Sequence, residues 1–175
     1  MNYHKIEKTS IANGEGIRVV LWVSGCTLHC NGCHNPETWS FNSGKLFDEA
    51  AKQELFEALN KSYIQGITFS GGHPLEDENV LDIYSLIVEI KEKLPEKDIW
   101  LYTGYKLEHI LKPVEHNQII DCRKQIVNMC DVVVDGRYIE SLRDITLRFR
   151  GSKNQNIWRK RDNIWSNGKG DTMYG

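Results

Sequence analysis

Hydrophobic and polar residues follow two kinds of pattern along the chain. Short continuous apolar runs rich in β-branched residues are typical of buried strands, and residues 17–24 form the first of them. Longer segments carry apolar residues at helical spacing, as at Leu81, Tyr84 and Val88. In chain order we predict strand 17–24, helix 48–60, strand 66–70, helix 78–93, strand 98–102, helix 119–129 and strand 131–135.

This alternation of strands and helices predicts an α/β fold, in which helices cover a parallel sheet. About four such units fit into the chain, whereas a full eight-stranded barrel needs about 250 residues. We therefore expect a partial (β/α) barrel with parallel strands and outer helices, or a doubly wound sheet. Ligands bind at the carboxyl ends of the strands in both folds. The segments after the predicted strands should converge on one rim: 25–35, 70–72, 103–104 and 135–136.

The strand and helix pattern fades near residue 152. Three basic residues follow each other at Arg159, Lys160 and Arg161, and glycines dilute the last ten positions. We predict a single domain over residues 1–157 and a basic, glycine-containing, flexible C-terminal tail over residues 158–175.

Composition excludes several classes of function. Of the 175 residues, 40% are hydrophobic and 26% are charged, which is ordinary for a globular protein, and the formal net charge is −2. This charge balance gives no reason to expect a nucleic-acid or membrane partner. The chain has neither the apolar core of a signal peptide nor a run of about 18 apolar residues. We expect a cytoplasmic protein, whose thiols stay reduced.

Three of the five cysteines crowd into eight residues directly after the first predicted strand. Cys26, Cys30 and Cys33 form the pattern C-x3-C-x2-C, and three thiolates on one loop can hold a metal centre. The odd total argues against a secreted disulfide scaffold. Cys122 and Cys130 lie on or near an apolar helix and are expected to be buried structural thiols.

Two of the possible interpretations of the cysteine loop require other features. The segment from Cys30 to His34 matches the C-x-x-C-H pattern of c-type haem attachment, but that site needs an exported protein and leaves Cys26 unexplained. A thioredoxin-like pair of Cys30 and Cys33 should open a helix. The Asn-Gly pair between these cysteines and the following Pro36 indicate a loop instead.

Two further interpretations involve metal. Structural zinc would take the three cysteines with His29 or His34 as the fourth ligand. A [4Fe-4S] cluster held by three cysteines would lack the usual fourth protein ligand and leave one iron open to a substrate or cofactor. An open iron is a reactive feature, so this interpretation predicts an enzyme.

The cysteine loop after the first strand resembles the signature of the radical S-adenosylmethionine superfamily. Longer motifs resemble the activating enzymes of glycyl-radical proteins, and among them the family that activates anaerobic ribonucleoside-triphosphate reductases. They occur in collinear order and cover about residues 1–157. These motifs lie at residues 13–18, 21–26, 31–39, 70–75, 98–107, 133–136 and 150–155.

The resemblance implies a mechanism and a set of partners. Cys26, Cys30 and Cys33 would ligate three irons of a [4Fe-4S] cluster, and S-adenosylmethionine would chelate the open fourth iron. Reductive cleavage of this cofactor would yield a radical that takes a hydrogen atom from a glycine Cα of the partner. The implied partners are the catalytic subunit of anaerobic ribonucleoside-triphosphate reductase and an electron donor such as reduced flavodoxin.

The resemblance also implies which residues bind S-adenosylmethionine. Glycine pairs at strand ends suit this task because the backbone can approach the ligand closely where Cβ is missing, although they also occur in simple tight turns. No catalytic residue beyond the cluster ligands is implied. The expected cofactor-binding residues are Gly32, His34, Ser70, Gly71, Gly72, Thr103, Gly104 and Asp135.

The chain departs from this family at two positions and leaves two other functions open. The superfamily commonly has an acidic residue where this chain has His73, and an imidazole cannot copy the acceptor role of a carboxylate. His34 stands where the family usually has Tyr; a ring there can stack or ligate zinc. The alternatives are a radical enzyme for another glycyl-radical partner or a small molecule, and a zinc-binding interaction module without catalysis.

Overall fold

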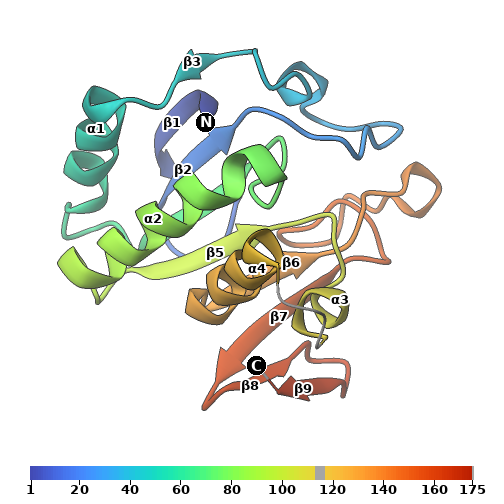
Figure 1. Ribbon diagram of the computed structural model, residues 1–175. Helices are drawn as coiled ribbons and strands as arrows, with labels where there is room; N and C mark the ends of the chain where they lie inside the picture. Colours follow the sequence, from blue (N-terminus) through green and yellow to red (C-terminus); the bar gives the residue numbers. More distant parts are fainter. Residues whose placement is uncertain (113–116, 175) are drawn as a thin grey trace.

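The computed structural model describes residues 1–112 and 117–174 and shows a mixed α/β fold built on one large sheet (Figure 1). Within these ranges no helix combines the length and apolarity that a membrane crossing needs. The strands are β1 (Asn2–Ser10), β2 (Arg18–Val23), β3 (Lys45–Leu46), β4 (Gly66–Gly71), β5 (Asp98–Tyr102), β6 (Val132–Asp135), β7 (Asn156–Arg161), β8 (Ile164–Ser166) and β9 (Thr172–Tyr174). The helices are α1 (Glu49–Leu59), α2 (Asp77–Lys93), α3 (Leu107–Leu111) and α4 (Gln118–Met129), with short 3-10 turns at Pro36–Thr38 and Glu140–Leu142.

The centre of the sheet is parallel. Strands β2, β4, β5 and β6 are neighbours in that order and pair in parallel, and α1, α2 and α4 lie in the connections between them. These elements confirm the predicted strands and helices to within a residue or two at each end. The cap of α1 shows why the prediction works, since the Asp48 side chain accepts a hydrogen bond from Ala51 N at 3.0 Å.

Antiparallel strands flank the parallel centre on both sides, and the sequence pattern did not predict them. The strand order is β3-β1-β2-β4-β5-β6-β7-β8-β9 among the described residues. In β1 only Tyr3 and Ser10 are buried, so its sequence is mostly polar and lacks the apolar run of a central strand. The sheet is therefore mixed rather than purely parallel.

Residues 158–174 contain β8, β9 and most of β7, where the sequence pattern predicts a flexible tail. β7 and β8 pair antiparallel around Asp162 and Asn163, which both have positive φ (50° and 62°), as a two-residue hairpin turn requires. Trp158 and Trp165 are buried in the core, with 6% and 0% of their surface exposed. The basic residues between the two tryptophans in the sequence interrupt the apolar pattern, so the pattern does not indicate this hairpin.

The two faces of the sheet are buried against different partners. Helices α1, α2 and α4 cover one face (Figure 1), and the main core lies between them and the sheet. Ile99 and Leu101 of β5 belong to this core. Trp100 belongs to a second, smaller cluster with Val132 and Val134, as the alternation of side chains along a strand dictates.

A buried arginine joins the amino ends of three parallel strands. The Arg18 side chain is fully buried, and its Nη2 lies 2.6 Å from Asp98 Oδ1. Its guanidinium also donates to Thr68 Oγ1 at 2.9 Å and to Ile67 O at 2.8 Å. These contacts tie β2, β4 and β5 together at the end opposite the cysteine loop, and a paired, hydrogen-bonded guanidinium is the form in which such a charge is tolerated inside a protein.

Candidate metal centre and cofactor pocket

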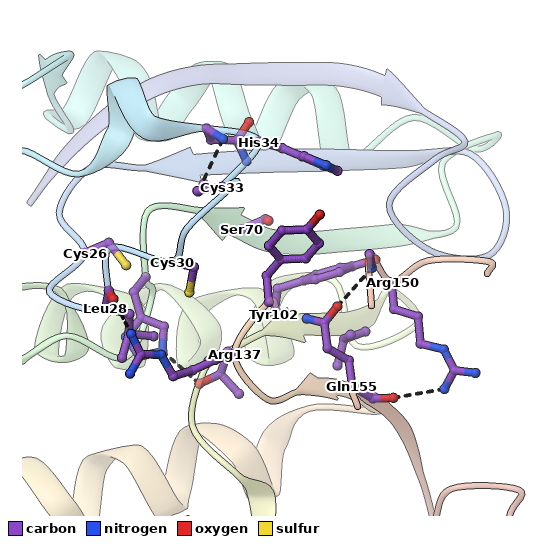
Figure 2. A pocket seen from close by; sticks show the side chains of 18 of the residues that line it. Cys26, Leu28, Cys30, Cys33, His34, Ser70, Tyr102, Arg137, Arg150 and Gln155 are labelled. Carbon is purple, nitrogen blue, oxygen red and sulfur yellow. Dashed lines mark hydrogen bonds between the residues drawn. The ribbon is translucent and has the colours of Figure 1, made fainter. Parts of the chain in front are cut away.

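The segments that follow the parallel strands meet in one pocket, as the sequence pattern predicts (Figure 2). The cavity has a volume of about 580 Å³. The cysteines of the loop after β2 line it, together with residues 70–73 at the end of β4, 102–104 at the end of β5 and 136–138 after β6. Figure 2 shows the cysteines at one end of the pocket, Arg150 and Gln155 at the other, and Ser70 and Tyr102 between them.

The three cysteines of the loop differ in exposure. Cys26 is buried, whereas Cys30 and Cys33 are half-buried, and all three are free thiols. Burial raises the pKa of the Cys26 thiol, although the N–H groups of Leu28 and His29 donate to its sulfur and partly oppose this shift. A metal ligand must be a thiolate, so binding at Cys26 displaces a proton.

The spacing of the thiols bears on which metal group suits the loop. Within the described residues, no three Cys, His, Asp or Glu side chains are close enough together to hold a single metal ion. A four-iron cluster is wider than one ion, so its ligand sulfurs stand further apart. Thiolates are the ligands of iron–sulfur clusters, and three of them face one cavity here. The donor set therefore fits an iron–sulfur cluster better than a single zinc ion.

The two histidines considered as zinc ligands both pack against aromatic rings. His29 stacks on Trp39, with ring centroids 4.6 Å apart and planes at 29°. His34 lies against Tyr138 at 5.4 Å. The two rings are tilted at 48°, and His34 lines the pocket beside Cys33.

Backbone hydrogen bonds hold the start of the cysteine loop against the segment that follows it. Gly25 N donates to Thr38 O at 2.7 Å, and Cys26 N donates to Trp39 O at 3.0 Å. Gly25 has a φ of 93°, and a Cβ there would lie 2.2 Å from the Phe41 ring. Only glycine satisfies both the conformation and the contact.

The predicted residues Ser70, Gly71 and Gly72 all line the pocket. A Cβ on Gly72 would lie 2.5 Å from Gly25 O, and Gly71 has a φ of 105°. The glycine pair thus lets the end of β4 pack backbone against backbone on the cysteine loop. This close approach goes beyond what a simple tight turn requires.

Thr103 and Gly104 also line the pocket and contact neighbouring segments of the rim. Thr103 Oγ1 lies 2.8 Å from His73 Nε2 and accepts a hydrogen bond from Tyr105 N at 3.1 Å. A Cβ on Gly104 would lie 2.1 Å from Leu28 Cδ1, so this glycine makes room for the cysteine loop.

Two predicted residues lie outside the lining of the cavity. Gly32 has a φ of 74°, and a Cβ there would lie 2.1 Å from Glu140 Oε2. Asp135 is buried behind the pocket, where its Oδ2 accepts from Leu107 N at 2.9 Å and its Oδ1 accepts from Asn156 Nδ2 at 3.2 Å. These partners give Asp135 a role in joining β6, α3 and β7 rather than a direct path to a ligand.

The pocket contains residues to which the sequence analysis assigned no role. Tyr102 donates its hydroxyl to Phe149 O at 2.8 Å, and burial raises the pKa of its phenol far above the usual value, so it stays neutral. Arg150 Nη1 donates to Gln155 O at 3.0 Å, and its buried Nε has no protein partner. The signal was present, because residues 150–155 form one of the family-like motifs.

Comparison with known proteins identifies the family. The family model of a 4Fe-4S single cluster domain matches residues 12–158. Curated proteins named anaerobic ribonucleoside-triphosphate reductase-activating protein are 43% identical over 165 residues in Enterobacteria phage T4 (94% of this chain, 98% of the relative) and 42% identical over 157 residues in Escherichia coli K12 (89% and 96%). The relative from Haemophilus influenzae is 40% identical over 161 residues (91% and 98%). The chain belongs to this family of activating proteins.

As a member of the family, the chain carries an iron–sulfur cluster domain, and the matched range contains the whole rim described above. Cys26, Cys30 and Cys33 lie inside it, as do the strand ends that line the cavity. The family-like motifs of the sequence and the pocket of the structure therefore fall in the same 4Fe-4S domain.

Proposed function

We propose that this chain is a radical S-adenosylmethionine activase, which cleaves the cofactor reductively at a [4Fe-4S] cluster and generates a glycyl radical on anaerobic ribonucleoside-triphosphate reductase. The observation that supports this most strongly is the three-cysteine loop that lines one end of a pocket formed at the carboxyl ends of parallel strands. The curated relatives are named for activating that reductase. In this proposal the four parallel strands, with helices over one face, act as a partial (β/α) barrel, and residues 1–157 form the radical S-adenosylmethionine domain.

The proposed ligands of the cluster are Cys26, Cys30 and Cys33, which would leave the fourth iron to S-adenosylmethionine. When held there, the cluster would supply the electron for reductive cleavage of S-adenosylmethionine, the chemistry by which a glycine of the reductase would lose a hydrogen atom. The chain's own contribution is to position these groups and to exclude competing reactions. All three cysteines line the cavity, and Cys26 is the one buried from water.

The remaining pocket residues would orient the cofactor. Gly71 and Gly72 expose backbone at the cavity wall, which suits close contact with the methionine amino group. His34 offers a ring edge beside Cys33. At the far end, the free Arg150 Nε can donate to a polar atom of the cofactor or of the inserted partner segment.

The proposed partners are the catalytic subunit of the reductase and an electron donor such as reduced flavodoxin, in the cytoplasm. The arm that borders the pocket, residues 137–153, carries five cations and two carboxylates: Arg137, Arg143, Arg148, Arg150, Lys153, Glu140 and Asp144. An excess of positive charge beside the opening favours an acidic surface on the incoming protein.

The experiment that tests this function compares wild type with Cys30→Ala after anoxic reconstitution with iron and sulfide. Wild type should bind about four irons and form 5′-deoxyadenosine from S-adenosylmethionine under reduction. Cys30→Ala should lose this cleavage, whereas the control Cys122→Ala, which removes a thiol on α4, should retain it. Equal cleavage by Cys30→Ala and wild type would overturn the ligand assignment.

The alternatives give different results in the same preparation. A zinc-binding module would be colourless, with about one zinc and no labile sulfide. An activase of another glycyl-radical enzyme, or an enzyme for a small molecule, would cleave the cofactor but form no radical on the reductase.

A further inference from the structure

His73 and Glu76 form a buried pair beside the cysteine loop. Their side chains are 2% and 5% exposed, and His73 Nδ1 lies 3.3 Å from Glu76 Oε1. The other ring nitrogen, Nε2, lies 2.8 Å from Thr103 Oγ1, and the ring meets Tyr105 edge-on at 4.4 Å. The residue that breaks the acidic pattern of the superfamily therefore has a hydrogen bond on one side and, on the other, a close contact with the carboxylate three positions later.

Glu76 uses its carboxylate to hold the residue directly after Cys26. Its Oε1 accepts from Thr27 N at 2.8 Å and from Thr27 Oγ1 at 2.9 Å, and its Oε2 lies 3.2 Å from the same hydroxyl. Thr27 is exposed, so these hydrogen bonds connect the buried Glu76, at the start of α2, to a loop on the surface. The carboxylate thus joins the rim of the sheet to this part of the loop, next to Arg137, whose Nη2 donates to Leu28 O.

The environment keeps Glu76 charged. Burial by itself would raise the pKa of its carboxyl, but the His73 ring and the Thr27 donors together hold it below its usual value. An ionised carboxylate can only accept hydrogen bonds, so the ring nitrogen that faces Glu76, Nδ1, is the one that carries a hydrogen. Nε2 shares a hydrogen bond with the Thr103 hydroxyl at 2.8 Å. Each member of the chain Thr103–His73–Glu76–Thr27 thus orients the next.

We propose that Glu76 is a positioning residue for the cysteine loop and that His73 anchors it to the end of β5. Glu76 supplies the carboxylate that the chain lacks at position 73, but directs it to the backbone beside Cys26 instead of into the cavity. The consequence for the cluster rests on the proposed function; the hold on Thr27 does not. The pair joins three segments, each of which follows a parallel strand.

The first test measures amide hydrogen exchange in the metal-free protein. In Glu76→Gln one carboxylate oxygen becomes an NH2 donor, so a single acceptor must serve both Thr27 and His73. Exchange at Thr27 should become about tenfold faster or more, because a hydrogen bond to a charged group is lost. The matched control is Glu78→Gln, an exposed glutamate two residues on in α2, which should leave this exchange unchanged.

A second variant keeps the test sharp should Glu76→Gln fold poorly. Thr27→Val removes only the hydroxyl of an exposed residue, so the fold should survive and exchange across residues 27–33 should rise severalfold. The effects of the two variants should be smaller in combination than their sum, because both break the same contact. Exchange that stays within a factor of about two of wild type in both variants would overturn the proposal.

A second readout uses the reconstituted protein. Glu76 places a negative charge near the loop, and a cluster's reduction potential depends on nearby charge and on the order of its surroundings. Glu76→Gln should therefore shift the potential upward, while Glu78→Gln should not. Failure of wild type to cleave S-adenosylmethionine would refute the proposed function and leave the exchange result standing; an unchanged potential with fast wild-type cleavage would refute the inference about the cluster.

Discussion

Two pairs of polar side chains occupy opposite ends of the same parallel strands, and they serve different purposes. At the amino ends, Arg18 pairs with Asp98 and donates to Thr68 and to backbone carbonyls of the sheet. At the carboxyl ends, Glu76 pairs with His73 and accepts from Thr27 in the cysteine loop. The first pair joins strands to strands, whereas the second joins the sheet to a loop.

The difference shows how one sheet separates stability from chemistry. Regular strands supply their own hydrogen bonds, so an ion pair among them adds rigidity to a part that is already fixed. The cysteine loop has little regular structure, and its position depends on single side chains such as Glu76 and on glycines that allow close approach. We expect substitutions at the amino ends to change the stability of the fold, and substitutions at the carboxyl ends to change the metal centre.

The largest effect on stability should come from breaking the pair of Arg18 and Asp98 at the amino ends of the strands. Arg18→Met would leave the buried Asp98 Oδ1 without its cation and should lower the free energy of unfolding by about 3–5 kcal/mol. The control Arg159→Met removes a surface pair with Glu15 and should cost about 1 kcal/mol or less. Denaturant titration of the metal-free proteins measures both. Equal losses of unfolding free energy in the two variants would show that the Arg18–Asp98 pair stabilises the fold no more than the surface pair does.

The same substitution, glycine to alanine, can be made at both ends of β4: at Gly66, its first residue, and at Gly72, directly after it. A Cβ at Gly66 would lie 2.0 Å from Asp98 O, and a Cβ at Gly72 would lie 2.5 Å from Gly25 O. Each change to Ala pushes on backbone and should cost about 1–3 kcal/mol. Gly72→Ala should also reduce iron bound per folded molecule, because Gly25 precedes Cys26, whereas Gly66→Ala should not. The same iron content in both variants would contradict the division between the two ends.

Acid should weaken the contacts of Glu76 with His73 and Thr27. The pKa of Glu76 is lowered in the folded protein, so its carboxylate contributes stability above its ordinary pKa of about 4.3 and loses that contribution as the pH falls through the lower folded value. The stability difference between wild type and Glu76→Gln should be constant from neutral pH to about pH 5 and shrink below about pH 4. Thermal unfolding of the metal-free proteins across this range measures it. A difference that grows toward acid would reverse the assigned sign.

The smallest expected effect concerns thiol reactivity. Burial raises the pKa of Cys130, just before β6, to about 12, and it also raises the pKa of Cys26. In the metal-free protein at neutral pH, iodoacetamide should modify the half-buried Cys30 and Cys33 first, Cys26 at least severalfold more slowly, and Cys130 last. The rate at Cys26 should rise with pH as the thiolate forms. Mass spectrometry of the peptides gives the order of modification. Early labelling of Cys130 would contradict its burial at the amino end of β6.

The central elements of the fold could be predicted because their signals are local. Apolar runs marked β2, β4, β5 and β6, and helical spacing marked the helices between them. The flanking strands were missed because their sequences lack the continuous apolar run of a central strand. β1 is mostly polar and is held by pairing with β2, and the hairpin of β7 and β8 is held by Trp158 and Trp165, which lie among polar and basic residues. Tertiary contact, not local pattern, decides such strands.

The candidate site divides in the same way. The cysteine spacing and the glycines at strand ends were visible in the sequence, and the structure brings them to one pocket. The sequence did not show that the Asp135 side chain lies outside the cavity lining, because its partners Leu107 and Asn156 come from two other segments. Nor could the sequence show that the carboxylate of Glu76 reaches Thr27, a contact between residues 49 positions apart.

The most direct measurement of the central claim is electron paramagnetic resonance of the reductase after anoxic incubation with the reconstituted protein, S-adenosylmethionine and a reductant. Wild type should produce a glycyl radical signal on the reductase, and Cys30→Ala should produce none. The reductase used should be one that a related activating protein converts. Absence of the signal with wild type that holds about four irons would contradict the account.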